Sequence, residues 1–315
     1  MENYLNGFVK DLEVRNYSPE SIRKYAHCVK VFFGFLAGRT DLRKVGKVEL
    51  NAYLEALSRN PNYSVHHVAA NVRAVKCFFR YLKKAQVVLH DFSSVLVEPK
   101  KPKALPKEPL SSKEVKLMLE APDLRKPLGI RDRAILETFY SSGIRANEMC
   151  CLTLLDVDLE NGLLFIREGK GKKDRMVPLG KHACYFIKAY LEMVRPGMLA
   201  KGKAPLKTNR LWISRKGNAI SKSEITFLVR GYRLKAGIEK QVTAHSFRRT
   251  LAVELIRNEC DFLAVKEILG HSRSETTLRY CALSGVELKE VLKKCHPRYD
   301  TSEVDAKPHI TSFGS

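Results

Sequence analysis

A stretch rich in proline and lysine divides the chain. Residues 99–109, PKKPKALPKEP, contain four prolines and four lysines. Proline fixes the backbone and lacks an N–H donor, so this stretch is expected to stay extended. The 315 residues are enough for two domains with cores of their own. We therefore predict one domain at 1–98, a linker at 99–109, a second domain at 110–298 and a loose tail at 299–315.

The first domain is predicted to be helical. Apolar residues at helical spacing indicate helices at 2–14, from Pro19 to near Gly38, at 48–57, and from Ser64 onward. In the last of these helices the apolar residues lie on one side, and the other side is basic: Arg73, Lys76, Arg80, Lys83 and Lys84. A basic side can be simply solvated. In this chain we favour a surface that faces DNA.

The charge of the whole chain supports that choice. Formal net charge is +22, and residues 1–105 hold 18 Lys and Arg against 9 Asp and Glu, which is +9 and leaves +13 for the rest. A large positive excess attracts the phosphate backbone of nucleic acid. Both domains are thus expected to bind double-stranded DNA, and the linker lysines Lys100, Lys101 and Lys103 to run along its backbone.

The second domain is predicted to be mainly α-helical with a small antiparallel β-sheet. The strands LLFIRE (163–168) and RMVPL (175–179) flank the tight turn GKGKKD, and LWIS (211–214) is one more short strand. Ser111 and Glu114 form a capping box. Helices are expected at 111–120, 129–140, from about Arg145, and at 181–194, 222–235, 245–258, 261–269, 274–282 and 285–295.

Cysteine usage and hydropathy indicate the compartment. The eight cysteines form no C-x-x-C pair, and several lie on apolar helical faces, which is typical of reduced thiols in a cytosolic protein. The charged N-terminus is no signal peptide, and no apolar run is long enough for a membrane span. We expect a cytoplasmic, nucleoid-associated protein that has no membrane contact, cofactor or metal site.

Several residues suggest chemistry on a phosphodiester. Attack on such an anionic diester builds charge on its oxygens, and arginines stabilise that charge because each donates two hydrogen bonds and stays protonated. Arg145, at the start of a helix, and Arg248 are the candidates. Tyr280 is the candidate nucleophile, but a phenol titrates near 10 and needs a base or a cationic pocket.

Proton transfer requires further groups. His245 lies three residues before Arg248, on the same helix face, and His271 follows Gly270, a predicted helix C-cap. Either histidine could accept the phenolic proton. The leaving oxygen needs an acid, and Lys170, Lys172 and Lys173 of the GKGKKD turn are all eligible. Each residue alone is more often structural, and only their order and spacing together favour a site.

These segments together resemble the tyrosine recombinases, the family of phage integrases and Xer recombinases. SGIRANEM resembles the family's first arginine box, GKGKKDRMVPL its catalytic hairpin, HSFRRT its His-x-x-Arg box, LGHS its second histidine and TTLRY its nucleophile. Arg249 stands where a third histidine is common, and Ala146 and Asn147 replace the usual pair before Glu148. The resemblance selects Lys170 among the lysines and implies that Glu148 supports the active site.

The resemblance covers nearly the whole chain, since 1–98 is similar to the family's core-binding (SAM-like) domain. It implies a two-domain DNA clamp and a site-specific recombinase that works through a 3′-phosphotyrosyl intermediate and a Holliday junction, without ATP or metal. It also implies a homotetramer or heterotetramer on two DNA sites. The ending KKCHPR resembles the Xer branch, so helix 285–295 is expected to pack on a neighbouring subunit or back on its own domain.

Two rival functions share these residues. A type IB topoisomerase would relax DNA as a monomer, and an idle regulator would bind DNA without cleaving it. The N-terminal helical domain and the Xer-like ending argue against the topoisomerase, and the complete set of catalytic residues argues against the regulator. The biological role stays open between chromosome resolution, plasmid resolution and integration of a mobile element, as do the target sequence and any accessory protein.

Overall fold

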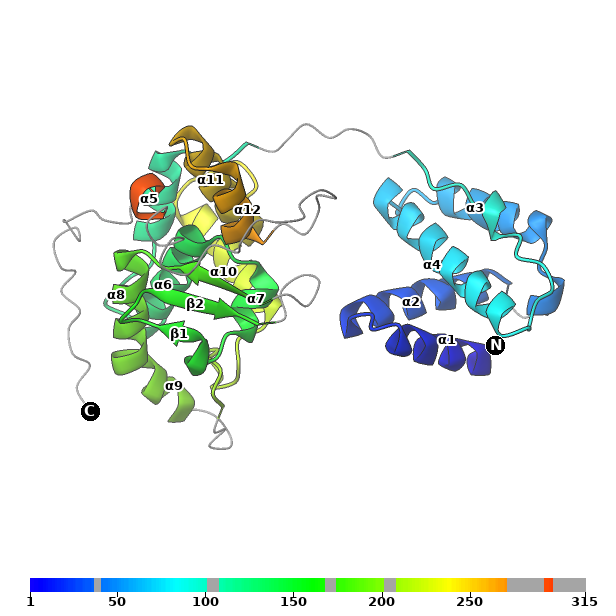
Figure 1. Ribbon diagram of the computed structural model, residues 1–315, viewed down its shortest axis with the longest axis horizontal. Coiled ribbons are helices and arrows are strands. Elements are labelled where there is room, and N and C mark those ends of the chain that lie inside the picture. Colours follow the sequence, from blue (N-terminus) through cyan, green and yellow to red (C-terminus); the bar gives the residue numbers. More distant parts are fainter. Residues whose placement is uncertain (37–40, 101–107, 168–173, 201–207, 271–291, 297–315) are drawn as a thin grey trace. The chain divides into compact units, whose positions relative to one another are not determined.

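The chain forms two compact units, Met1–Pro106 and Lys107–Ser315. The structure is a computed structural model that describes residues 1–36, 41–100, 108–167, 174–200, 208–270 and 292–296 (Figure 1). The division falls inside the proline-rich stretch 99–109. The domain limits expected from the sequence, 98 and 110, stay predictions.

In its described residues the N-terminal unit has four α-helices: α1 (Glu2–Val14), α2 (Pro19–Leu36), α3 (Lys47–Arg59) and α4 (Val65–Lys84). As predicted, Ser64 caps α4 by accepting a hydrogen bond from the His67 N–H. Helix α4 contacts the other three helices, and its apolar side is buried among their aromatic rings. Phe32, for example, meets Tyr53 and Phe79 edge-on, with ring centroids 4.9 and 5.9 Å apart.

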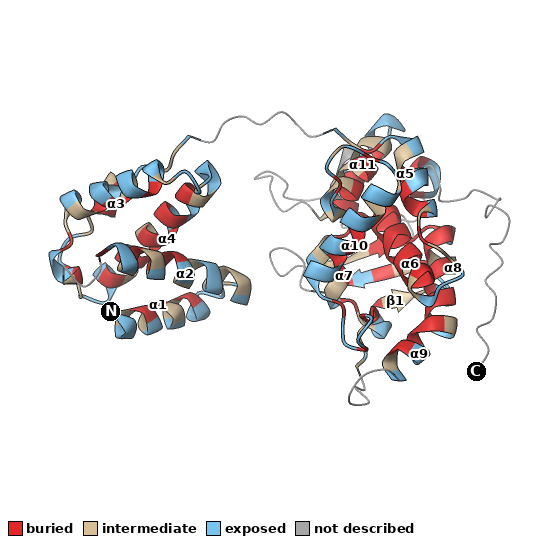
Figure 2. Ribbon diagram, turned by 180° about the vertical axis from the view of Figure 1, so that it is seen from behind, coloured by how far each residue is buried: buried red, intermediate tan, exposed pale blue. Residues whose placement is uncertain are grey.

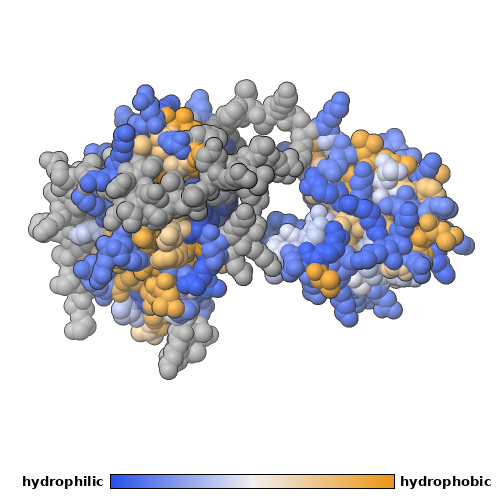
Figure 3. Space-filling view, viewed as in Figure 1, coloured by the Kyte–Doolittle hydropathy of each residue, from blue (hydrophilic) through white to orange (hydrophobic). Residues whose placement is uncertain are grey.

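The surface of this unit is largely polar. Figure 3 shows hydrophilic side chains over most of the visible face of the N-terminal unit, with apolar ones in small patches. Helix α4 follows the predicted pattern, because Arg73 and Arg80 are exposed, Lys76 is half-buried, and the apolar side is buried. Two short 3₁₀ turns, Leu42–Lys44 and Ser93–Val95, add to the connections.

The C-terminal unit surrounds one central helix. Helix α6 (Pro127–Ser142) is buried from Gly129 to its end, and Figure 2 shows it as an almost continuous buried segment. It contacts α5 (Ser112–Glu120), α8 (Lys181–Ala189) and α11 (Ala244–Arg257). The remaining described helices are α7 (Ala146–Cys151), the π-helical turn Tyr190–Val194 that continues α8 into α9 (Arg195–Ala200), α10 (Lys222–Lys235) and α12 (Phe262–Leu269).

A three-stranded antiparallel sheet lies against this core. The strands β1 (Val157–Asp158), β2 (Leu163–Ile166) and β3 (Arg175–Pro178) pair in the order β1-β2-β3, with Leu164 opposite Val177 and Ile166 opposite Arg175. Leu164, Ile166 and Val177 are buried, whereas Phe165 is partly exposed. The sheet therefore has one face on the core, and the predicted α-helical fold with a small antiparallel sheet is confirmed.

The structure differs from the predicted elements at three places. The segment 211–214 is no strand but a buried connection with an isolated bridge from Ile213 to Ala219. Its polar backbone is satisfied by side chains, since the Tyr190 hydroxyl donates to the Leu211 carbonyl and accepts from the Ile213 N–H. Strand β1 has only two residues and was not predicted. The helix predicted at 181–194 continues through the π-helical turn into α9, where Pro196 is the second residue.

Candidate active site

Arg145 is positioned by the turn between α6 and α7. Gly143 ends α6 in the left-handed conformation, with φ of 59°, and Arg145 then becomes the N-cap residue of α7. Its side chain donates to Glu148 Oε1 at 2.7 Å and to the carbonyl of Gly270 at 3.0 Å. Glu148 also accepts from the Arg145 N–H at 2.8 Å, so one carboxylate holds both ends of this residue.

Arg248 reaches the same place from α11. Its side chain is buried, with 2% of the residue exposed, and it donates to the carbonyls of Gly143, at 2.8 Å, and Leu269. Burial, and to a smaller extent the neighbouring charge of Arg145, lower the pKa of Arg248 to about 10. The guanidinium therefore stays charged at neutral pH, beside a second cation.

Two helix ends organise this pair of arginines. Gly143 closes α6 and Gly270 closes α12, both with left-handed backbones at φ of 59° and 60°. Each exposes a carbonyl that one arginine uses: Arg248 binds Gly143, and Arg145 binds Gly270. A Cβ atom at Gly143 would lie 2.9 Å from Leu251, so the close approach of α11 also requires glycine there.

His245 stands one helical turn before Arg248. It is the second residue of α11, two residues after the N-cap Thr243, and its side chain is exposed, unlike that of Arg248. Desolvation lowers the pKa of His245, and the cations of Arg248 and Arg249 lower it further. The imidazole is therefore mainly neutral at pH 7 and can accept a proton.

Glu148 is the counter-charge of the site. Burial by itself raises the pKa of this carboxyl, but hydrogen bonds from Arg175 and Arg145 outweigh it, and the pKa falls to about 2. Arg175 supplies two of these bonds, at 3.1 Å to Oε1 and 2.8 Å to Oε2. Two guanidinium groups thus bind one carboxylate, and with Arg248 nearby the site keeps an excess of positive charge.

Arg175 was not among the residues singled out from the sequence. It opens β3 two residues before the buried Val177 and therefore shares the core-facing side of the strand. A charged residue at a core-facing position of a strand needs a buried partner. An arginine at this position of a predicted strand could therefore have identified Arg175 from the sequence. The partner, Glu148, lies on α7 and could not be paired with it by spacing.

Several predicted residues lie outside the described residues. These are Lys170, Lys172 and Lys173 of the turn, His271, Tyr280, and the linker lysines Lys101 and Lys103. The structure brings together Arg145, Glu148, Arg248 and the first turn of α11 that carries His245. Lys100 is described and exposed. In the part of the chain that the structure describes, no three His, Cys, Asp or Glu side chains gather as a metal site.

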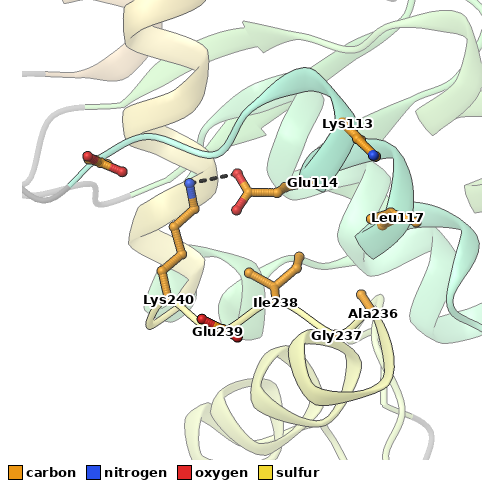
Figure 4. Close-up of a pocket in the computed structure, with 9 residues that line it drawn as sticks. Lys113, Glu114, Leu117, Ala236, Gly237, Ile238, Glu239 and Lys240 are labelled. Carbon is orange, nitrogen blue, oxygen red and sulfur yellow. Dashed lines mark ion pairs between the residues drawn. The ribbon is translucent and has the colours of Figure 1, made fainter.

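The entry to the C-terminal unit is held by polar contacts. Lys240 Nζ lies 2.6 Å from Glu114 Oε2 and donates to the Pro109 carbonyl at 2.9 Å, beside a pocket between α5 and the connection from α10 to α11 (Figure 4). Thr250 Oγ1 accepts from the Leu110 N–H. None of the residues that line this pocket belongs to the arginine pair. The contacts of Lys240 and Thr250 hold the first residues of the C-terminal unit in place.

The described end of the chain packs on its own unit. Leu292 and Cys295 are buried in the core of the C-terminal unit, and the carbonyl of Cys295 accepts from Asn258 Nδ2 at 2.6 Å. The His296 ring is buried against Tyr140, with ring centroids 5.1 Å apart. The predicted helix 285–295 is described only at 292–295. These four residues pack back on their own domain, which is one of the two placements expected from the sequence.

Comparison with known proteins gives the same fold and family. The phage integrase family model matches residues 108–285, and the phage integrase N-terminal SAM-like domain matches residues 4–88. Tyrosine recombinase XerD of Listeria monocytogenes serotype 4b is 30% identical over 303 residues, covering 95% of this chain and 100% of the relative. Tyrosine recombinase XerC of Natranaerobius thermophilus is 36% identical over 243 residues, covering 77% of this chain and 80% of the relative.

A solved structure shares the fold. The XerH site-specific recombinase bound to difH substrate matches with a TM-score of 0.63 at 24% identity, covering 84% of this chain and 79% of that chain. The matches define a tyrosine recombinase, an enzyme with a helical N-terminal domain and a larger C-terminal domain. The chain belongs to the phage integrase family, and the two relatives named above, which match most of the chain, are Xer recombinases. None of the helices in the described segments is long and apolar enough to cross a membrane.

Proposed function

We propose that this enzyme is a site-specific DNA recombinase in which Tyr280 attacks the scissile phosphate. The phenolic oxygen forms a bond to phosphorus while the bond to the 5′ oxygen breaks, which gives a 3′-phosphotyrosyl link and a 5′ hydroxyl. The hydroxyl of a partner duplex then reverses this step and joins the exchanged strands. The bond energy stays in the phosphotyrosine, so the exchange needs no ATP.

The observation that carries the proposal is the convergence of Arg145 and Arg248. They approach from different helices, and each binds a carbonyl at the end of α12, Gly270 for Arg145 and Leu269 for Arg248. Two guanidiniums can bind the non-bridging oxygens of a phosphate, where charge builds in the transition state. The segment that follows Gly270 begins with His271 and leads to Tyr280.

The remaining roles concern protons. His245 is the proposed base for the Tyr280 phenol, because its lowered pKa keeps it neutral beside the arginines. His271 is proposed to donate to a phosphate oxygen. Lys170 is the proposed acid that protonates the leaving 5′ oxygen. Each proton thus has a donor and an acceptor, and Glu148 is left to hold Arg145 rather than to carry a proton.

The proposed substrate is double-stranded DNA bound by both domains, with four subunits on two recombination sites. A lambda integrase tetramer bound to a Holliday junction shares the fold, with a TM-score of 0.66 at 15% identity, and covers 87% of this chain and 75% of that chain. The basic side of α4, the linker lysines and the turn lysines Lys172 and Lys173 are proposed to contact phosphate. Such an enzyme acts in the cytoplasm, on nucleoid DNA.

The test is trapping on a nicked suicide duplex, which loses the 5′ hydroxyl needed for religation. DNA that copurifies with the trapped protein supplies the target sequence for this duplex. Wild-type protein should form a covalent adduct that survives denaturation, and Tyr280→Phe should bind the duplex without an adduct. Tyr185→Phe, a half-buried tyrosine on α8, is the matched control and should trap normally. An adduct in the Tyr280→Phe protein would refute the assignment of the nucleophile.

A further inference from the structure

Arg175 occupies an unusual position for a charged side chain. Its side chain is only 10% exposed, and it crosses from the first residue of β3 to α7, where its two terminal nitrogens bind both oxygens of Glu148. Such a bidentate pair fixes the plane of the carboxylate as well as its distance. Arg175 is thus the link between the hairpin and the helix that Arg145 begins.

The fixed carboxylate in turn positions Arg145. Glu148 Oε1 accepts from both Arg175 Nη1, at 3.1 Å, and Arg145 Nη1, at 2.7 Å. These cations outweigh the effect of burial and keep the carboxylate charged, with a pKa of about 2. If the carboxylate turned, Arg145 would lose the partner that aims its guanidinium, and its second partner, the Gly270 carbonyl, would be the only one left among the described contacts of its side chain.

Arg175 also contacts the end of α12. A Cβ atom built on Gly270 would lie 2.9 to 3.0 Å from its Nε, Cδ and Cζ atoms, so the guanidinium lies directly against this glycine. Its Nε is buried and has no hydrogen-bond partner within the described segments. The charge of Arg175 reaches Arg248 as well, where it contributes to the lowered pKa. One side chain therefore touches both partners of the Arg145 guanidinium, Glu148 and Gly270.

We propose that Arg175 is a positioning residue for strand cleavage, which holds Arg145 through Glu148. The same contact connects Arg145 to the hairpin. Arg175 lies five residues after Lys170 in the sequence, at the first paired position beyond the turn. This inference rests on the proposed function.

The matched pair of variants is Arg175→Met and Arg167→Met. Arg167 follows β2 at the other side of the same turn, and its ion pair with Asp156 is also short, at 2.6 Å, but its side chain is 65% exposed. At saturating suicide duplex, Arg175→Met should lower the single-turnover cleavage rate by roughly 100-fold, as expected for a misplaced catalytic group. Its dissociation constant for DNA should change by less than about threefold, since few phosphate contacts are lost.

Three comparisons separate positioning from a general structural role. Arg167→Met should cleave at the wild-type rate. Arg175→Lys keeps the charge but not the fork, so it should recover folding without recovering more than a small part of the rate. In the double variant Arg175→Met with Glu148→Gln, the rate should be no lower than in Glu148→Gln alone, because the two residues act as one unit.

Two results would overturn the inference. Cleavage by Arg175→Met at the wild-type rate shows that Arg145 does not depend on it, and multiplicative losses in the double variant show that Arg175 acts apart from Glu148. If Arg175→Met does not fold, Arg175→Lys decides, and its cleavage at the wild-type rate also refutes the need for a fork. Failure of the wild-type protein to form any adduct refutes the proposed function instead.

Discussion

The two units use arginine in different ways. In the N-terminal unit, arginines pair with carboxylates at the surface, as in Arg73 with Glu98, whose side chains are 46% and 38% exposed. In the C-terminal unit several lie inside, as in Arg133 with Glu137, whose side chains are 9% and 2% exposed, although others such as Arg167 pair at the surface. The first arrangement leaves the guanidinium available to a polyanion. The second cannot be broken without leaving a charge in the core.

This difference separates binding from catalysis in one chain. Exposed arginines attract DNA over several ångströms. Water and salt screen each of these contacts, so a small movement of the side chain changes its energy little. Buried arginines act at short range, and their direction is set by fixed carbonyls and carboxylates, as at Arg145 and Arg248. A clamp on a transition state needs that fixed direction. The predictions below test this contrast by removing one member of a charged pair, first in the core and last at the surface.

Removing a buried partner should have the largest effect on stability. Glu137→Ala leaves Arg133 charged in the core, stacked 4.7 Å from the Phe186 ring, and should lower the free energy of unfolding by about 3–5 kcal/mol. Fluorescence of Trp212 reports on this unit alone during urea unfolding, because Trp212 is the chain's single tryptophan and is buried there.

The control for this change is a pair of the same spacing at the surface. Lys188 and Glu192 are also four residues apart, 4.0 Å from each other, and their side chains are 67% and 62% exposed. Glu192→Ala should cost less than about 1 kcal/mol. Equal losses in the two variants would show that burial does not distinguish these ion pairs.

Glu148 predicts a pH dependence at the active site. Its folded pKa of about 2 lies below the usual value of 4.5, so its charge stabilises the folded state above pH 4.5 and the benefit disappears as pH falls toward 2. At pH 6, Glu148→Gln should therefore lower the free energy of unfolding by about 3 kcal/mol. The difference in free energy of unfolding between wild type and Glu148→Gln, measured by Trp212 fluorescence, should narrow between pH 4.5 and 3. A constant gap would mean that Glu148 does not ionise with this pKa.

The same contrast explains what could be predicted from the sequence. Helix α4 has an apolar side and a charged, largely exposed side, so its spacing alone predicts which residues are buried. Helix α6 carries charged residues at 131, 132, 133 and 137, yet all of them are buried because they pair within the core. Its periodicity therefore could not reveal that it is the central helix. Pattern analysis is reliable where charge lies in water and unreliable where charge is satisfied by tertiary contacts.

The candidate site divides in the same way. Arg145, His245 and Arg248 follow from motif order, and the structure places the two arginines together. Their main-chain partners at Gly143, Leu269 and Gly270 could not be predicted, because a carbonyl acceptor depends on how helices meet rather than on residue type. The roles of the predicted residues, including those outside the described segments, stay proposals.

The smallest expected effect concerns the exposed pair on α4. Arg73→Gln should change the free energy of unfolding by less than about 1 kcal/mol, because its pair with Glu98 is half in water. If Arg73 contacts a phosphate, the slope of log K against log salt for duplex binding should fall in magnitude by about 0.9. Arg59→Gln, which removes a more exposed pair with Glu55 on α3, serves as the control and should leave the slope unchanged. Equal slopes for both variants would place DNA away from this side of α4.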